Sequence, residues 1–135
     1  MTARTLVLSG GRKLVLDSLG TSVDYPLNRP FVALAPAFDA EERQRVEAIA
    51  STLMDLGCME FCCVGPQAEQ LHESLDEIVE ERGALEVVTT WHTDYSDACE
   101  YFLFAAAGGR PPTLLALISS HRQLAALLED AAHSE

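Results

Sequence analysis

The sequence predicts an α/β domain with a three-layer, flavodoxin-like or Rossmann-like arrangement: a mainly parallel sheet of about four strands alternating with helices, plus an N-terminal β-hairpin. From residue 30 onward, short apolar runs alternate with stretches of helical periodicity. Strands that alternate with helices of this length pair in parallel through right-handed crossovers. The 135 residues, 48% of them hydrophobic, are the usual size of one domain. We therefore expect a single domain over residues 1–135.

The first strand–helix unit follows Pro30. Residues 31–35 are all apolar, as is typical of a strand covered on both faces. Asp39, with Glu42 three residues later, fits an N-terminal capping pair. Gly57 is placed to end the helix in a left-handed conformation. Between them, apolar residues at helical spacing form one buried stripe: Val46, Ile49, Ala50, Leu53 and Met54.

Three further units repeat this pattern. Their strands are expected at residues 59–64, 85–90 and 113–118. Their helices are expected to run from Gly65-Pro66 to Gly83, from Ser96 or Asp97 to about Ala107, and from Ser119 or Ser120 onward. Residues 1–29 differ in character: segments 5–8 and 13–16 flank Ser9-Gly10-Gly11-Arg12, which predicts a hairpin, and a loop over residues 21–29 leads into a core at 30–135.

The charge is strongly acidic, with 21 acidic against nine basic residues and a net charge of -12. Phosphate binding needs clustered basic residues, so nucleic acids and anionic membrane surfaces are disfavoured as partners. No apolar run approaches the roughly 18 to 20 residues of a membrane span. The N-terminus lacks an apolar signal segment, so we expect a cytoplasmic protein. A basic protein would be attracted to this chain; alternatively, the charge only maintains solubility.

Four cysteines are expected in the core, where a free thiol behaves as a small hydrophobe. Cys58, Cys62 and Cys63 lie in or directly before the second predicted strand, and Cys99 lies in the third predicted helix. Their spacing supports neither a zinc site nor a disulfide framework, so no metal and no cofactor are expected.

Ligands of open parallel sheets bind beyond the carboxyl ends of the strands, where the strand order reverses. If the order is 2-1-3-4, the crevice lies between the first and third strands, with Phe38, Asp39, Trp91, His92 and Asp94 around it. A histidine titrates near neutrality, so His92 would be an acid, a base or a ligand contact, with Asp94 orienting it. In the alternative interpretation Asp94 caps a helix, His92 bonds a loop and Trp91 closes the core.

A cysteine nucleophile is a second catalytic hypothesis. Cys99 falls in the first turn of the third helix, where the helix dipole lowers a thiol pKa, and His92 and His121 are candidate neighbours. A buried core position is the alternative. His72 and Asp76 are four residues apart and are expected on a solvated helix face. The chain has no glycine-rich phosphate loop and no G-x-S-x-G elbow, and Lys13, its only lysine, cannot serve a receiver-type site.

The third predicted helix offers no polar face over residues 101–107. A helix that is apolar all round must be buried all round. Either the N-terminal hairpin covers its outer side, or another subunit does, through interface candidates such as Tyr101 and Phe104.

Several strings resemble an uncharacterised bacterial family of small cytoplasmic α/β domains. They are Cys58 to Pro66, Leu71-His72 with Asp76, and Val88-Thr89-Thr90-Trp91-His92 followed by an acidic loop and an aromatic helix. The resemblance covers roughly residues 30–107, with the TTWH string at a strand end, and it implies no activity.

The sequence thus favours a non-catalytic protein-interaction module, of an acidic immunity, antitoxin or regulatory type, that binds a protein partner or a second copy of itself. The acidic balance, the apolar third helix and the missing catalytic signature support this hypothesis. The alternative is a small-molecule-binding domain or an enzyme that uses the strand-end site around His92 and Asp94. The fold class does not decide between them.

Overall fold

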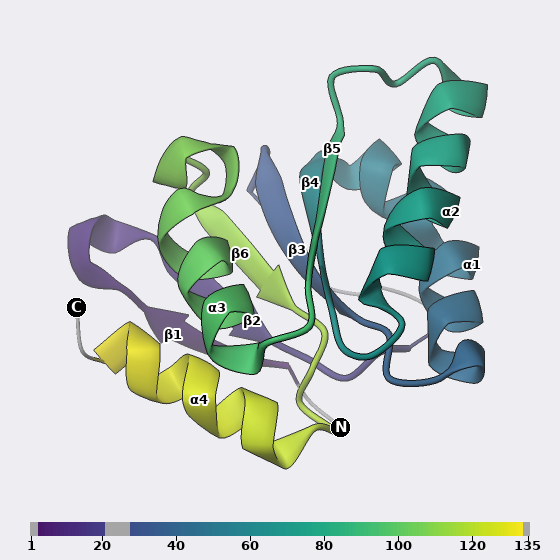
Figure 1. The fold of residues 1–135 in the computed structure, drawn as a ribbon. Coiled ribbons are helices and arrows are strands. Elements are labelled where there is room, and N and C mark those ends of the chain that lie inside the picture. The colour runs from purple at the N-terminus through teal and green to yellow at the C-terminus, as the bar shows by residue number, and fades with distance from the viewer. Residues whose placement is uncertain (1–2, 21–27, 134–135) are drawn as a thin grey trace.

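The computed structural model describes residues 3–20 and 28–133, in which one sheet lies between two pairs of helices (Figure 1). The strands are β1 (Arg4–Val7), β2 (Lys13–Leu16), β3 (Phe31–Pro36), β4 (Cys58–Val64), β5 (Val88–His92) and β6 (Thr113–Ala116). The helices are α1 (Ala40–Leu56), α2 (Ala68–Arg82), α3 (Tyr95–Glu100) and α4 (Arg122–His133), with short helical turns η1 (Ser9–Gly11), η2 (Tyr101–Ala105) and η3 (Ala106–Gly109). All four predicted strand–helix units are present.

The sheet has more strands than predicted, because the N-terminal hairpin joins it. The order is β1-β2-β6-β3-β4-β5, and only the β1–β2 pair is antiparallel. Lys13 to Leu16 of β2 pair in parallel with Thr113 to Ala116 of β6. Leu14, Val15 and Leu16 are buried, so β2 is covered on both faces like the other inner strands. Most of the predicted loop over residues 21–29 lies outside the described residues.

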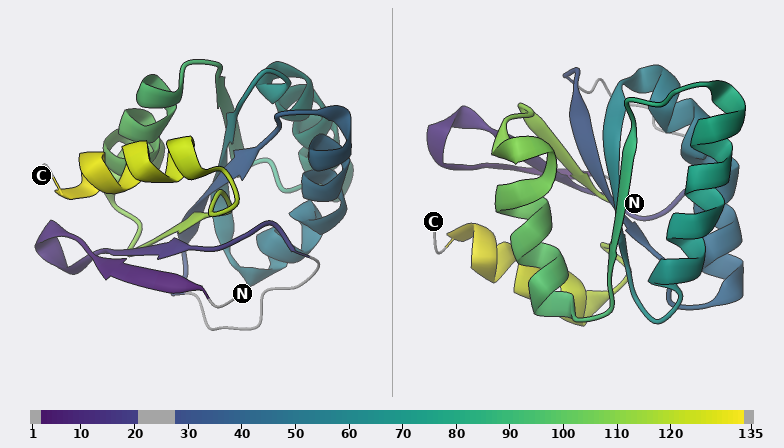
Figure 2. Two further views of the ribbon diagram at one scale, coloured as in Figure 1. Left: turned by 90° about the horizontal axis from the view of Figure 1, so that it is seen from below. Right: turned by 45° about the horizontal axis from the view of Figure 1, so that its top comes forward.

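The strand order also differs from the assumed one. Among the four strands of the βα units, β6 lies beside β3 on the side away from β4, and β5 lies beyond β4. The assumption that the first and third strands are neighbours is therefore wrong, because β4 separates β3 from β5. The order reverses between β3 and β6 instead. β5 becomes an edge of the sheet, and it lies in front of the other strands in Figure 2 (right).

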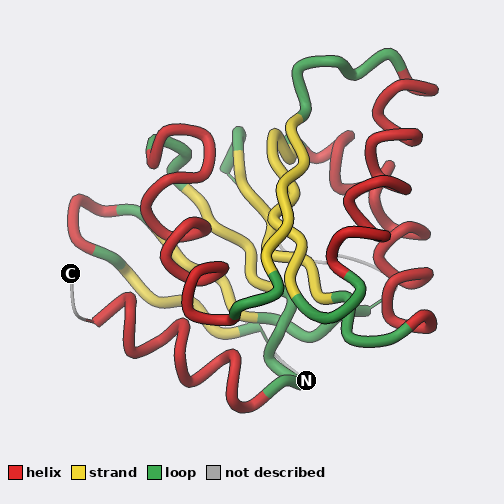
Figure 3. The backbone as a smooth tube through the Cα atoms, in the orientation of Figure 1, coloured by secondary structure: helices red, strands yellow, loops and turns green. Residues whose placement is uncertain are grey.

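Helices cover both faces of the sheet, as the tube in Figure 3 shows. One core is formed by residues of α1 and α2 packed on the sheet, among them Val46, Leu53, Leu71 and Leu75. The other core joins α3, η2 and α4 to the opposite face. This is the predicted three-layer arrangement.

The predicted caps of α1 are confirmed, whereas α3 is capped by Asp94 rather than by the predicted Ser96 or Asp97. The Asp39 side chain accepts a hydrogen bond from the Glu42 N–H at 2.8 Å, and Gly57 has φ 111° at the end of α1. A Cβ atom at position 57 would lie 2.7 Å from Cγ of Arg29. Both the positive φ and this close approach therefore favour glycine. No helix within the described ranges is long and apolar enough to cross a membrane.

Several element boundaries differ from the prediction. β6 ends at Ala116 rather than residue 118, α3 begins at Tyr95, and α4 begins at Arg122 rather than directly after Ser119 or Ser120. β5 begins at Val88 rather than Leu85, because α2 ends at Gly83 and a turn follows in which the Val87 N–H bonds the Ala84 carbonyl. The predicted helix to Ala107 is α-helical only to Glu100, and a π-turn and a 3₁₀ turn follow. Ala107 has a left-handed φ of 50°, which ends helical continuation.

Candidate functional site

The edge strand β5 has its free side toward the viewer in Figure 1, between α2 and α3. The His92 carbonyl accepts a bond from the Gly65 N–H beyond β4, at 3.3 Å. Backbone groups of successive strand residues alternate in direction, so those of Val88, Thr90 and His92 bond β4. The N–H and C=O groups of Thr89 and Trp91 point away from it. An edge strand of this kind is a template for pairing with another chain.

The side chains along this edge are more apolar than those of an ordinary solvated strand. Val88 is 48% exposed and Trp91 is 39% exposed. Leu85, in the loop that leads into β5, is 76% exposed. Three large exposed hydrophobic side chains therefore lie within seven consecutive residues.

Side-chain hydrogen bonds hold β5 to helix α2 and to the neighbouring strand β4. Oγ1 of Thr89 bonds Nδ1 of His72 on α2 at 2.7 Å and also bonds Asp76. His72 and Asp76 thus anchor the strand, whereas the sequence predicted only a solvated helix face for them. On the other face, Oγ1 of Thr90 donates to Oε2 of Glu60 at 3.2 Å. These anchors fix the strand in an extended conformation while its outer edge stays open.

Acidic residues are frequent in the chain segment that contains the edge strand. Between residues 69 and 100, which span α2, β5 and α3, the chain has ten acidic residues and one basic residue, Arg82. All ten acidic residues are exposed. Arg82 itself is paired with Asp55 of α1 at 2.5 Å. We call residues 69–100 the acidic segment.

His92 and Asp94 do not form the predicted pair. The Asp94 side chain caps α3 by accepting a bond from the Asp97 N–H at 2.8 Å, which is the capping alternative. The His92 ring lies 5.2 Å from the Tyr101 ring, and its Nδ1 is buried with no hydrogen-bond partner among the described residues. Neither residue lines the two cavities found near the strand ends.

The order reversal between β3 and β6 brings other residues together. The Phe38 ring stacks on the His121 ring with centroids 4.0 Å apart. Nε2 of His121 lies 2.6 Å from Oε2 of Glu42, whose other oxygen accepts the Phe38 N–H. A cavity of about 190 Å³ adjoins Phe38, Tyr95 and His121. Of the predicted strand-end residues, Phe38 and His121 line this cavity, whereas Trp91, His92 and Asp94 do not.

Sequence reasoning missed the carboxylate that is most buried among the described residues. Glu60 of β4 is only 2% exposed, in a strand that is otherwise apolar. Its oxygens accept bonds from the Tyr101 hydroxyl at 2.6 Å, the Ala107 N–H at 2.9 Å and Thr90. Burial, and then the bond to Glu60, raise the pKa of Tyr101. The sequence did contain a signal for this site, because Glu60 is the one charged residue in a strand that was predicted to be buried.

The cysteines do not form a reactive site. All four are free and buried. Burial raises the pKa of the Cys99 thiol to about 11, so the thiolate needed by the nucleophile hypothesis is disfavoured. No group of three metal-ligating side chains is found among the residues that the structure describes.

The apolar third helix is partly covered by its own chain. Phe102, Leu103 and Ala106 are buried, and Nη1 of Arg12 in the hairpin donates to the Leu103 carbonyl at 2.8 Å. Phe104 remains 43% exposed. The hairpin therefore covers one side of this segment.

The comparisons with known proteins identify a family without an assigned activity. A family model described as "Domain of unknown function (DUF7684)" matches residues 17–132, which include β3 to β6, the helices α1 to α3, and α4 except for its last residue. A search of curated proteins finds none that matches the chain.

Proposed function

We propose that this chain, which belongs to the DUF7684 family of domains of unknown function, is a protein-interaction module whose docking site is the edge strand β5. The partner is a basic, extended segment of another protein that adds to the sheet beside β5. The observation that carries the proposal is the open edge itself, with Trp91 and Val88 exposed along it.

Strand addition would use two kinds of contact. The outward backbone groups of Thr89 and Trp91 supply hydrogen bonds, which bind any extended segment. Side chains of the incoming strand that alternate in direction would contact Val88 on one face and Trp91 on the other. Exposed aromatic side chains are common anchors of protein interfaces.

The acidic segment decides the chemistry of the partner. The ten exposed carboxylates of this segment would attract a chain rich in lysine and arginine and speed its association. They also oppose a second copy at this edge, because pairing β5 with β5 would bring two acidic segments together. An acidic neutraliser of a basic protein, as expected from the sequence, would use the surface in this way.

The proposal also gives a role to the TTWH string at residues 89–92, which becomes the docking strand. We keep the bacterial cytoplasm as its location, since four free buried cysteines suit a reducing compartment. The alternative of a small-molecule site around His92 and Asp94 lacks comparable support, because Asp94 caps α3 and neither residue lines a cavity near the strand ends.

Trp91 is the only tryptophan of the chain, so its fluorescence reports directly on this edge. We expect a synthetic peptide of alternating valine and lysine to shift the Trp91 emission saturably, and more weakly as salt rises. A peptide of alternating valine and glutamate is the matched control. Equal shifts with both peptides, or no shift with the basic one, would contradict the proposal.

A pair of variants separates backbone pairing from side-chain effects. Thr89→Val and Thr89→Pro both remove the hydroxyl that bonds His72, but only proline also removes the outward N–H. We expect Thr89→Val to bind the basic peptide and Thr89→Pro to bind it at least tenfold more weakly, with both folded by circular dichroism. A concentration-dependent dimer in sedimentation would instead point to a second copy as the partner.

A further inference from the structure

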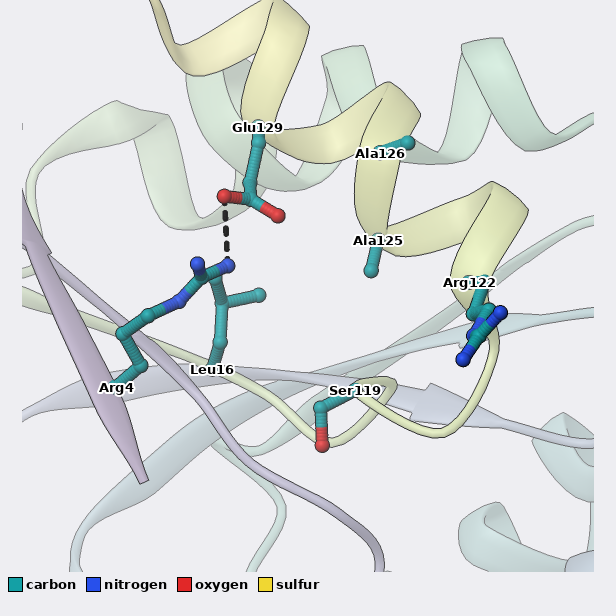
Figure 4. Close-up of a pocket in the computed structure, with 7 residues that line it drawn as sticks. All are labelled: Arg4, Leu16, Ser119, Arg122, Ala125, Ala126 and Glu129. Atoms are coloured by element: carbon teal, nitrogen blue, oxygen red, sulfur yellow. Dashed lines mark ion pairs between the residues drawn. The ribbon is translucent and has the colours of Figure 1, made fainter. Parts of the chain in front are cut away.

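A separate cavity of about 350 Å³ lies between the N-terminal hairpin and α4 (Figure 4). Leu16, the last residue of β2, and Ser119, just beyond β6, line it. The cavity is therefore at the carboxyl ends of two parallel strands, where ligands of such sheets bind. Its volume is in the range of small-molecule sites.

The charges at the two ends of the cavity differ. At one end, Arg4 of β1 and Glu129 of α4 form an ion pair at 2.6 Å, so their charges cancel (Figure 4). At the other end is the exposed guanidinium of Arg122, which pairs with no carboxylate among the described residues. In a chain of net charge -12, this side chain forms an ion pair with none of the acidic residues that the structure describes.

The position of Arg122 is not explained by helix stability. It is the first residue of α4, where a positive side chain is disfavoured by the helix dipole. An anion placed in the cavity would be attracted by the guanidinium. The cavity itself has an apolar part, formed by Leu16 with Ala125 and Ala126.

We infer that this cavity binds a small carboxylic acid with an apolar body, its carboxylate on Arg122 and its body against Leu16 and Ala126. Because the charges of Arg4 and Glu129 cancel, Arg122 supplies one positive charge to the cavity, which suits a monoanion. A phosphate carries more charge and has no apolar part, so it fits less well both the apolar wall and a strongly acidic protein. Neither Trp91 nor Val88 lines the cavity, so this site is independent of the edge strand.

Titration calorimetry with 3-phenylpropionate, its neutral amide and inorganic phosphate tests the inference, with amide shifts of α4 in NMR spectra locating the site. We expect the acid to bind saturably and the amide and phosphate at least tenfold more weakly, since one charge-assisted hydrogen bond is worth about a factor of ten. No saturable binding of the acid, or equal binding of the amide or phosphate, would overturn it.

Variants distinguish this cavity from general charge attraction. Arg122→Gln should weaken binding of the acid about tenfold, whereas Arg110→Gln, the same change at another exposed arginine, should leave it unaltered. Ala126→Leu fills the apolar part at an exposed position and should abolish binding. Equal effects of the two arginine variants, or unchanged binding by Ala126→Leu, would refute the assignment.

Discussion

Replacing Glu60 tests how the irregular segment after α3 is held. This carboxylate is 2% exposed and accepts bonds from Tyr101 and from the Ala107 N–H. Glu60→Ala removes both acceptor oxygens, whereas Glu60→Gln keeps the shape and one oxygen. We expect the alanine variant to loosen residues 101–109, because the hydrogen bonds that join Tyr101 and Ala107 to β4 are lost.

The magnitude follows from the bonds that are lost. A hydrogen bond to a charged group is worth about 1.5 to 3 kcal/mol. Two effects reduce the loss. Tyr101 is partly exposed, so its hydroxyl can bond water instead of Glu60. The alanine variant also no longer has to bury the negative charge of the Glu60 carboxylate. We therefore expect Glu60→Ala to lower the free energy of unfolding by about 3 kcal/mol and Glu60→Gln by about 1 kcal/mol.

Urea unfolding followed by circular dichroism measures both values. With an m-value of about 1.5 to 2 kcal/mol/M, the midpoint of Glu60→Ala should fall by about 1.5 to 2 M at unchanged m. Hydrogen exchange should rise most at residues 101–109. A loss within about 0.5 kcal/mol of zero for Glu60→Ala would refute the reasoning, because that is the range of ordinary surface changes.

Three further predictions concern the thiols, Tyr101 and Glu42. The four buried cysteines should resist a disulfide reagent at pH 7 and all react on unfolding; fast reaction of any one in the native protein would contradict their burial. Because the pKa of Tyr101 is raised in the folded protein, its contribution to stability is complete below its ordinary pKa near 10 and is lost above it. The stability difference between the protein and Tyr101→Phe should therefore shrink as pH rises from 10, and a constant difference would exclude this linkage. Glu42→Gln weakens contacts to both His121 and the Phe38 N–H and should cost about 1 to 2 kcal/mol in urea unfolding, against nearly none for the exposed control Glu41→Gln.

Local signals in the sequence predicted the local structure well. Asp39 and Gly57 cap α1 because capping depends on a few neighbouring residues. The role of Asp94 as a cap was one of two interpretations, and the hydrogen bond to Asp97 confirms it. The hairpin was also correct, but nothing in its own residues indicates that β2 pairs with β6.

The candidate site was harder to predict, because it depends on strand order. Apolar periodicity shows that a strand is covered but not which strand lies beside it. With β4 between β3 and β5, Trp91 is on an exposed edge rather than in a crevice with Phe38. Glu60 was missed for a related reason: its partners Thr90, Tyr101 and Ala107 are 30 to 47 residues away along the chain.

The central claim is that a basic, extended segment pairs with β5, and hydrogen exchange at single amides tests it most directly. Addition of the valine–lysine peptide should slow exchange at the outward N–H groups of Thr89 and Trp91. The N–H groups of Thr90 and His92 already face β4 and should change little. Binding that leaves Thr89 and Trp91 unprotected, or equal protection by the valine–glutamate peptide, would contradict the account.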